Sequence, residues 1–219
     1  MENTISGKKV LILIITGFML FAACLGGIYT KSHAAEAANE AILGSSNGKS
    51  YVNNYFNIKI PLYKNMTAAD DAKLAADNGV DANGYTAEKR LAAINSCEPT
   101  FVQHYETPRK DLVVLVGRFS SDEEKKSFEQ DFLKERLAYA VDDWKKDPDF
   151  TDVTGEITKI NCLGKTRPVA LVKAKYNGYD YTLVEFLYVK NDYYIHFAIS
   201  GLGTNQVELL QKAKRAYKQ

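Results

Sequence analysis

The sequence has few of the side chains from which enzymes and metal sites are usually built. Its 219 residues include only three histidines and three cysteines. It contains no Gly-x-Ser-x-Gly elbow for a nucleophilic serine and no cysteine–histidine signature. A glycine-rich phosphate loop is also missing, because Gly201-Leu202-Gly203 is better explained as a strand-to-helix turn. We therefore predict that the protein is not an enzyme and has no cofactor.

A strong net charge is absent as well. Residues 1–34 contain three lysines and one acid, so the 28 basic and 27 acidic residues of the chain become 25 and 26 beyond them, a net charge of −1. Binding to nucleic acid through its phosphates needs an excess of lysine and arginine, so we exclude nucleic acid as a partner. The same balance gives no support for attraction to a membrane surface through a basic patch.

A long apolar run occurs near the N-terminus, over residues 10–29. Lys8 and Lys9 precede it and Lys31 follows it. A basic start followed by an apolar run of this length directs a protein out of the cytoplasm. Residues 1–34 are therefore predicted to be a signal peptide or membrane anchor, and the rest of the chain is expected to be extracytoplasmic.

Three fates of this segment remain open. If it is uncleaved, residues 10–29 are long enough to span a bilayer as a helix and would anchor the protein in the cell membrane. The small residues of Ser32-His33-Ala34 fit cleavage before Ala35, which would give a secreted domain. The third alternative takes Phe21-Ala22-Ala23-Cys24 as a lipoprotein signal, with the lipid on Cys24.

Residues 35–49 are predicted to be a linker. Their first part is rich in alanine and glutamate, and Gly44-Ser45-Ser46-Asn47-Gly48 has the composition of a flexible segment. The remaining residues, 50–219, are predicted to form one domain, because about 170 residues are enough to bury a core.

The domain is predicted to combine short strands with a few helices. Aromatic and β-branched residues favour strands, whereas capping residues and apolar residues at helical spacing indicate helices. The predicted strands cover residues 51–60, 100–106, 111–119 and 153–161, followed by two hairpins. The predicted helices cover residues 67–77, 86–95, 121–146 and 204–218, and the helix over 121–146 begins with a capping box formed by Ser121 and Glu124.

The turns of the two hairpins predict their register. Asn177-Gly178 is a preferred pair for a two-residue type I′ turn, and Asn191-Asp192 can form the next turn. The predicted cross-strand pairs are Lys175 with Asp180, Val172 with Leu183, Phe186 with Phe197, and Leu187 with His196. Both faces of these strands are largely apolar, so both must be covered. The predicted fold class is α+β, an antiparallel sheet covered by helices on both faces.

Two stretches carry a resemblance to a known family. The first predicted strand reads Tyr51-Val52-Asn53-Asn54-Tyr55-Phe56-Asn57-Ile58-Lys59-Ile60-Pro61, and a late hairpin strand reads Asp192-Tyr193-Tyr194-Ile195-His196-Phe197-Ala198-Ile199. Together with a closing helix, they resemble PsbP-like domains of exported bacterial proteins. The resemblance spans roughly residues 50–218 and implies an antiparallel sheet between helices. The family's fold is associated with binding other proteins, and no catalytic residue is carried over from it.

Glu185 and His196 are the sharpest local candidates for a ligand site. In the predicted register Glu185 lies opposite Ala198 and Ala170, and His196 is its diagonal neighbour. Small alanines beside a carboxylate and an imidazole leave room for a ligand or a metal. The competing interpretation is a partly buried ion pair under a helix, since one Glu–His pair lacks the three ligands of a catalytic metal site.

An acidic segment between the two short helices partly matches a calcium loop. Asp77, Asp81 and Glu88 fall at positions 1, 5 and 12 of a 12-residue loop, and Asn83 falls at position 7. The match fails at position 6, where the required glycine is Ala82. An ordinary loop between helices is the favoured interpretation.

Two cysteines lie beyond the N-terminal segment, Cys97 and Cys162. In an oxidising compartment they could form a disulfide that closes a long loop. Two buried free thiols are the other alternative, because two cysteines have no diagnostic spacing.

We therefore predict an exported, membrane-associated or secreted binding module, whose partner is a protein of the cell envelope. Tyrosines around the hairpin tips are expected mostly to pack across strands, while exposed ones would offer a contact surface. These tyrosines are Tyr176, Tyr179, Tyr181, Tyr188, Tyr193 and Tyr194. The alternative function is a metal-assisted hydrolase that uses Glu185 and His196.

Overall fold

The computed structural model describes residues 39–217, so the predicted signal peptide or anchor lies outside the described residues. Within this range no helix has the length and apolar character needed to cross a bilayer. The structure has an α+β architecture with two antiparallel sheets. Its elements, in chain order, are η1 (Glu40–Ile42), β1 (Ser45–Ser46), β2 (Ser50–Asn53), β3 (Ile58–Pro61), β4 (Thr67–Ala68), α2 (Asp71–Asp77), α3 (Ala87–Asn95), β5 (Thr100–Thr107), β6 (Lys110–Arg118), α4 (Asp122–Lys146), β7 (Phe150–Cys162), β8 (Lys165–Tyr176), β9 (Tyr179–Lys190), β10 (Tyr193–Leu202) and α5 (Gln206–Gln211).

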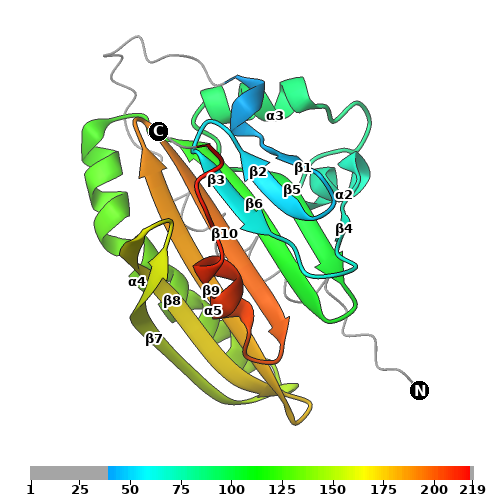
Figure 1. Ribbon diagram of the computed structural model, residues 1–219, viewed down its shortest axis with the longest axis vertical. Helices are drawn as coiled ribbons and strands as arrows, with labels where there is room; N and C mark the ends of the chain where they lie inside the picture. The colour runs from blue at the N-terminus through cyan, green and yellow to red at the C-terminus, as the bar shows by residue number, and fades with distance from the viewer. Residues whose placement is uncertain (1–38, 218–219) are drawn as a thin grey trace.

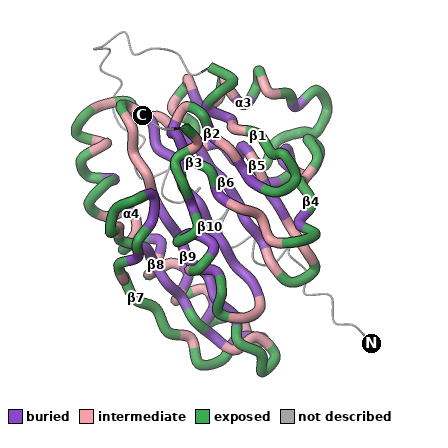
Figure 2. The backbone as a smooth tube through the Cα atoms, viewed as in Figure 1, coloured by how far each residue is buried: buried purple, intermediate pink, exposed green. Residues whose placement is uncertain are grey.

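A seven-stranded sheet forms the centre of the fold, with strand order β4-β5-β6-β10-β9-β8-β7. Figure 1 shows α4 behind this sheet, and the small sheet β1-β2-β3 together with α5 in front of it. The central strands are buried, and the exposed backbone lies at the rims and loops, as Figure 2 shows. The predicted need to cover both faces is confirmed, but the cover on the front face differs from the prediction.

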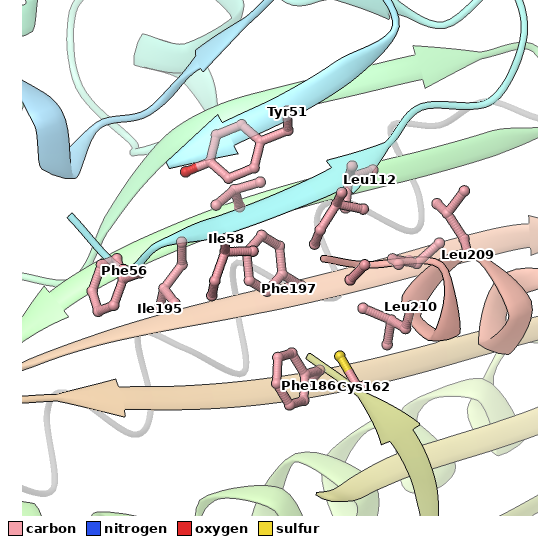
Figure 3. Packing of buried hydrophobic residues seen from close by; sticks show 14 of the residues in the cluster. Tyr51, Phe56, Ile58, Leu112, Cys162, Phe186, Ile195, Phe197, Leu209 and Leu210 are labelled. Atoms are coloured by element: carbon pink, nitrogen blue, oxygen red, sulfur yellow. The ribbon is translucent and has the colours of Figure 1, made fainter. Parts of the chain in front are cut away.

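The front face is covered mainly by strands instead of a helix. Tyr51, Phe56 and Ile58 from β2, β3 and their turn pack toward β10, and α5 completes the cover (Figure 3). The predicted strand over 51–60 is thus two strands, because the chain turns at Asn57, whose φ is 55°. The predicted closing helix over 204–218 is reduced to the six residues of α5, and the chain beyond it runs along β3, where Lys214 exchanges backbone hydrogen bonds of 2.8 and 2.9 Å with Lys59.

The folded unit begins earlier than residue 50. Ile42 and Leu43 are buried in the front core, and the Asn53 side chain donates a hydrogen bond of 2.8 Å to the carbonyl oxygen of Ile42. The strand β1 pairs with β2. Residues 39–49, which the sequence predicts as part of a flexible linker over 35–49, are therefore part of the domain, because their apolar side chains complete its core.

The two hairpins have the predicted register. The structure pairs Lys175 with Asp180 and Val172 with Leu183, and the turn residues Asn177 and Gly178 have φ of 48° and 83°. These positive values are those of a type I′ turn, which needs them at both central residues. The pairs Phe186 with Phe197 and Leu187 with His196 are also confirmed. Turn chemistry alone was sufficient here because a two-residue loop fixes every pair beyond it.

The helix α4 is confirmed as the cover of the rear face. Ser121 caps it by accepting a hydrogen bond of 3.1 Å from the backbone N–H of Glu124, whose carboxylate accepts one from the N–H of Ser120. Every fourth residue faces the sheet and is buried: Phe128, Phe132, Arg136, Ala140 and Trp144. One member of this stripe is a cation, so the rear core must hold a charge.

The start of α2 also differs from the prediction. Thr67 does not cap this helix but pairs with Glu106 in the short strand β4. Asp70 is the capping residue, and its carboxylate accepts a hydrogen bond of 2.8 Å from the N–H of Lys73. Aspartate is as strong a capping residue as serine or threonine, so the sequence did not distinguish a helix capped by Thr67 from one capped by Asp70.

The same substitution at two strand glycines is expected to destabilise the protein to different extents. A Cβ on Gly117 would lie 2.2 Å from the ring of Tyr194, which is buried against Phe119 and Phe128 and has no room to move. We expect Gly117→Ala to destabilise the protein by about 1–3 kcal/mol through overpacking. A Cβ on Gly155 would instead meet the methyl groups of Val141 and Leu137 at the half-buried margin of α4. Urea unfolding of Gly155→Ala should therefore show a smaller loss, and an equal loss would contradict this account.

Candidate functional site

Glu185 and His196 lie where the sequence predicts them. Glu185, in β9, is opposite Ala198 of β10 and Ala170 of β8, and His196 is the diagonal neighbour in β10. Both side chains are 1% exposed and face the rear core under α4. The imidazole Nε2 lies 3.5 Å from a carboxylate oxygen of Glu185.

Arg136 of α4 is the partner that the sequence analysis missed. Its Nε and Nη2 atoms donate hydrogen bonds of 3.1 and 2.9 Å to the two carboxylate oxygens of Glu185. The small side chains of Ala198 and Ala170 leave the space that the guanidinium occupies, since Arg136 is only 3% exposed. The signal was present in the sequence: Arg136 falls midway between Phe132 and Ala140 on the apolar stripe, where a charge needs a buried partner.

The electrostatics of this triad favour a charged pair beside a neutral imidazole. Burial acts to raise the pKa of Glu185, but the Arg136 guanidinium and the His196 ring outweigh it and hold that pKa at about 2. Burial lowers the pKa of His196 below its ordinary value, against the opposing effect of Glu185. The triad is therefore a carboxylate–guanidinium pair with His196 neutral at pH 7.

This arrangement disfavours metal chemistry at Glu185 and His196. Both carboxylate oxygens already accept hydrogen bonds from Arg136, whose fixed positive charge would repel a metal ion. Within residues 39–217, one group of three side chains has metal-ligand spacing, and it does not include Glu185 or His196. The predicted ion pair under a helix is present in a different form: Glu185 pairs with Arg136 instead of with His196, and this pair joins α4 to β9.

The calcium-loop residues do not converge on one point. Asp77 is buried at the end of α2, and its carboxylate lies 2.9 Å from Nδ1 of His104. Asp81 is exposed and accepts a hydrogen bond of 2.8 Å from the N–H of Asn83. The segment is an ordinary loop between helices, as the favoured interpretation predicts, because its first acid is held by a histidine from β5.

Cys97 and Cys162 are both free thiols in the structure. Cys97 follows α3 and is half-buried, with φ of 63°, whereas Cys162 ends β7 and is buried in the front core beside Phe186 and Leu210 (Figure 3). Burial raises the pKa of the Cys162 thiol to about 11. The structure therefore has two free thiols, as in the second alternative, but only Cys162 is buried and Cys97 is half-buried.

Most of the hairpin tyrosines are packing residues. Tyr181, Tyr193 and Tyr194 are buried, Tyr176 and Tyr188 are half-buried, and Tyr179 is 69% exposed at the β8–β9 turn. A single exposed ring does not make a contact surface of useful size. Of the six tyrosines that the sequence analysis places around the hairpin tips, only Tyr179 is exposed enough to contact a partner.

A groove between α4 and β7 is a more extensive surface feature. It has a volume of about 490 Å³ and is mainly apolar. Its helix side presents a stripe at helical spacing, and its strand side includes Ile157, which is 42% exposed. The lining residues are Lys134, Leu137, Ala138, Val141, Lys145, Val153, Thr154, Gly155 and Ile157.

The groove runs beside an open sheet edge. The strand β7 is the last of the seven-stranded sheet and is 13 residues long, and among residues 39–217 it pairs only with β8. Residues 154–157 are all exposed, so both the outer backbone edge and the adjacent side chains are accessible. A lysine marks each end of the helix side, Lys134 and Lys145. An open edge beside an apolar groove can accept a further extended strand.

Comparison with known proteins finds no matching protein family and no matching curated sequence. A solved structure described as LpqN, involved in cell envelope biogenesis of Mycobacterium tuberculosis, is similar to this chain with a TM-score of 0.36 and 9% sequence identity. The match covers 72% of this chain and 82% of that chain. A likeness at this level assigns no family, and the resemblance to PsbP-like domains stays a prediction.

Proposed function

We propose that the protein is an extracytoplasmic binding module that takes up an extended segment of a partner protein of the cell envelope along β7. The observation that carries the proposal is the combination of an open strand edge with an apolar groove under α4. The N-terminal sequence supports the location, since an apolar run after Lys8 and Lys9 is typical of export.

In this proposal the open edge of β7 binds the backbone of the partner segment, and the groove binds its side chains. A peptide that pairs with β7 satisfies the unpaired backbone groups of residues 154–157 and gains affinity from main-chain hydrogen bonds. Alternate side chains of an extended peptide point to one side, so every second one would enter the groove against Val141 and Ile157.

The charges at the groove predict the chemistry of the partner segment. Lys134 and Lys145 lie 11 positions apart on α4, which is about 16 Å along a helix axis. An extended chain covers this distance in about five residues. The expected ligand is therefore a segment with two or three apolar residues at alternate positions and an acidic residue at each end.

Affinity selection from a library of extended decapeptides tests the proposal. We expect the selected peptides to alternate apolar residues between acidic ends, and to gain affinity from main-chain hydrogen bonds to β7. Ile157→Asp should abolish binding because it places a charge in the apolar groove and repels the acidic ends. Fluorescence anisotropy with labelled peptides measures both effects on the full chain.

Two controls separate strand addition from other modes. Tyr179→Ser removes the exposed ring at the other hairpin and should leave binding unchanged. Methylation of alternate backbone nitrogens of the peptide should abolish binding if the backbone pairs with β7, because it removes the donors of the ladder. Binding that survives both Ile157→Asp and backbone methylation would show that β7 is not the site.

A further inference from the structure

A second group of charged side chains lies at the opposite edge of the same sheet. His104 and Glu106 are two residues apart in β5, and Asp111 in β6 lies directly opposite Glu106. Like charges placed opposite one another across two strands destabilise a sheet. The pair of Glu106 and Asp111 is therefore favourable only with positive groups or hydrogen-bond donors beside its carboxylates, and Lys73 and His104 occupy such positions.

The three side chains converge closely enough to hold one ion. One ligand atom of each of His104, Glu106 and Asp111 lies within 4.8 Å of the others. His104 Nε2 is 3.3 Å from Asp111 Oδ1 and 3.9 Å from Glu106 Oε2. His104 is fully buried and Asp111 nearly so, while the Glu106 side chain is 37% exposed. An ion would thus have protein on two sides and solvent access beside Glu106.

The other ring nitrogen of His104 is already oriented by a carboxylate. Nδ1 lies 2.9 Å from Asp77 Oδ2, and both groups are buried. An ionised carboxylate only accepts hydrogen bonds, so Nδ1 carries the proton of this bond. Metal-binding histidines commonly donate their second N–H to a carboxylate, which fixes the tautomer and the orientation of the ring. Asp77 therefore aims Nε2 at Glu106 and Asp111.

The charge balance of the cluster is negative. Asp77, Glu106 and Asp111 supply three carboxylates, and the neighbouring cation is Lys73, whose Nζ lies 3.4 Å from Glu106 Oε2. His104 Nε2 also lies at hydrogen-bond distance, 3.3 Å, from Asp111 Oδ1, and a metal ion bound at Nε2 would replace the proton of that bond. With all carboxylates ionised and His104 neutral in this metal-binding form, the cluster and Lys73 together carry a net charge of −2 before the ion is counted. A divalent ion matches this charge, whereas a single lysine at the rim of the cluster does not.

We propose that His104, Glu106 and Asp111 bind one divalent transition-metal ion, and that Asp77 holds the imidazole in the binding tautomer. One imidazole nitrogen with two carboxylate oxygens is a ligand set that suits Zn²⁺ or Mn²⁺. The site ties α2, β5 and β6 together, because Asp77 comes from α2 and the ligands come from both strands. It lies apart from the peptide groove, which is at β7.

Titration of the full chain with Zn²⁺ by calorimetry, after treatment with a chelator, tests the site. We expect one ion per chain. Glu106→Gln, at a half-exposed position that the fold tolerates, should weaken binding by about 10-fold to 100-fold, and so should Asp77→Asn. Lys73→Met should act in the opposite direction and tighten binding by roughly fivefold, because Lys73 competes with the ion for Glu106. If the cluster were only a set of structural ion pairs, Lys73→Met would not tighten Zn²⁺ binding while Glu106→Gln weakens it.

A spectroscopic readout identifies the histidine directly. Nitrogen NMR of the imidazoles should show Zn²⁺ at Nε2 of His104 with Nδ1 still protonated, and no change at His196. The matched control is Glu208→Gln, which removes an exposed acid paired with Lys212 and should leave Zn²⁺ affinity unchanged. Absence of Zn²⁺ binding by the wild type, or equal affinity in wild type, Glu106→Gln and Asp77→Asn, would overturn the proposal.

Discussion

Arg136→Met is expected to lower the free energy of unfolding by about 3–5 kcal/mol, because it leaves a buried carboxylate without its partner. Arg136 and Glu185 are both buried and joined by two hydrogen bonds. Without the guanidinium, Glu185 must either keep its charge in an apolar core or bind a proton to lose it, and either state costs free energy. Urea unfolding at pH 7 measures the loss.

The double variant Arg136→Met/Glu185→Leu shows whether the loss of stability comes from leaving the Glu185 charge unpaired or from losing the packing contacts of the Arg136 side chain. Replacing both partners removes the unpaired charge, and buried ion pairs exchanged for apolar groups are often neutral or stabilising. We expect the double variant to recover most of the stability. The control is Lys134→Met, two positions away in the same helix, whose exposed pair with Asp131 should contribute less than about 0.5 kcal/mol. A double variant as unstable as Arg136→Met would contradict this account.

Acidification is expected to remove stability through the same triad. The folded-state pKa of Glu185, about 2, lies below its ordinary value of 4.5. A carboxyl group with a lowered folded pKa stabilises the protein above its unfolded pKa, and this contribution is lost as the pH falls from 4.5 toward 2. The shift corresponds to about 3 kcal/mol. His196 acts in the same direction from about pH 6.5 downward, because its folded pKa is lowered and the unfolded chain binds the proton first.

Unfolding curves measured at a series of pH values check this dependence. The double variant Arg136→Met/Glu185→Leu lacks the carboxyl group, so its loss of stability between pH 4.5 and 2 should be smaller than that of the wild type by about 3 kcal/mol. The remaining carboxyl groups contribute equally to both proteins and cancel in the difference. Parallel curves for the two proteins would show that Glu185 is not held by Arg136.

The triad also connects the core to the proposed binding groove. Arg136 fixes α4 on β9, and the helix stripe from Lys134 to Lys145 forms one wall of the groove against β7. We therefore expect the width of the groove to depend on this buried charge pair. Peptide binding should weaken in Arg136→Met and return in the double variant, if the helix alone sets that width.

Local signals accounted for much of the fold. The turns Asn177-Gly178 and Asn191-Asp192 gave the correct register of three strands, because a two-residue turn determines the pairing of all residues beyond it. The capping residue Ser121 and the apolar spacing after it located α4. The strand over 51–60 was wrong because its residues have strand propensity throughout, and only packing decides that the chain turns at Asn57.

The sequence by itself determined the hairpin registers and the α+β class, because each depends on residues close together in the chain. The export signal over residues 1–34 stays a prediction, since it lies outside the described residues. The sequence also placed Glu185 beside His196. Only the tertiary structure decided what joins them: Arg136 is 49 positions from Glu185, and Asp77 is 27 positions from His104. Those contacts depend on how α4 and α2 lie across the sheet. Side chains that are ordinary in sequence become a buried pair or a candidate metal site only when packing removes water from them.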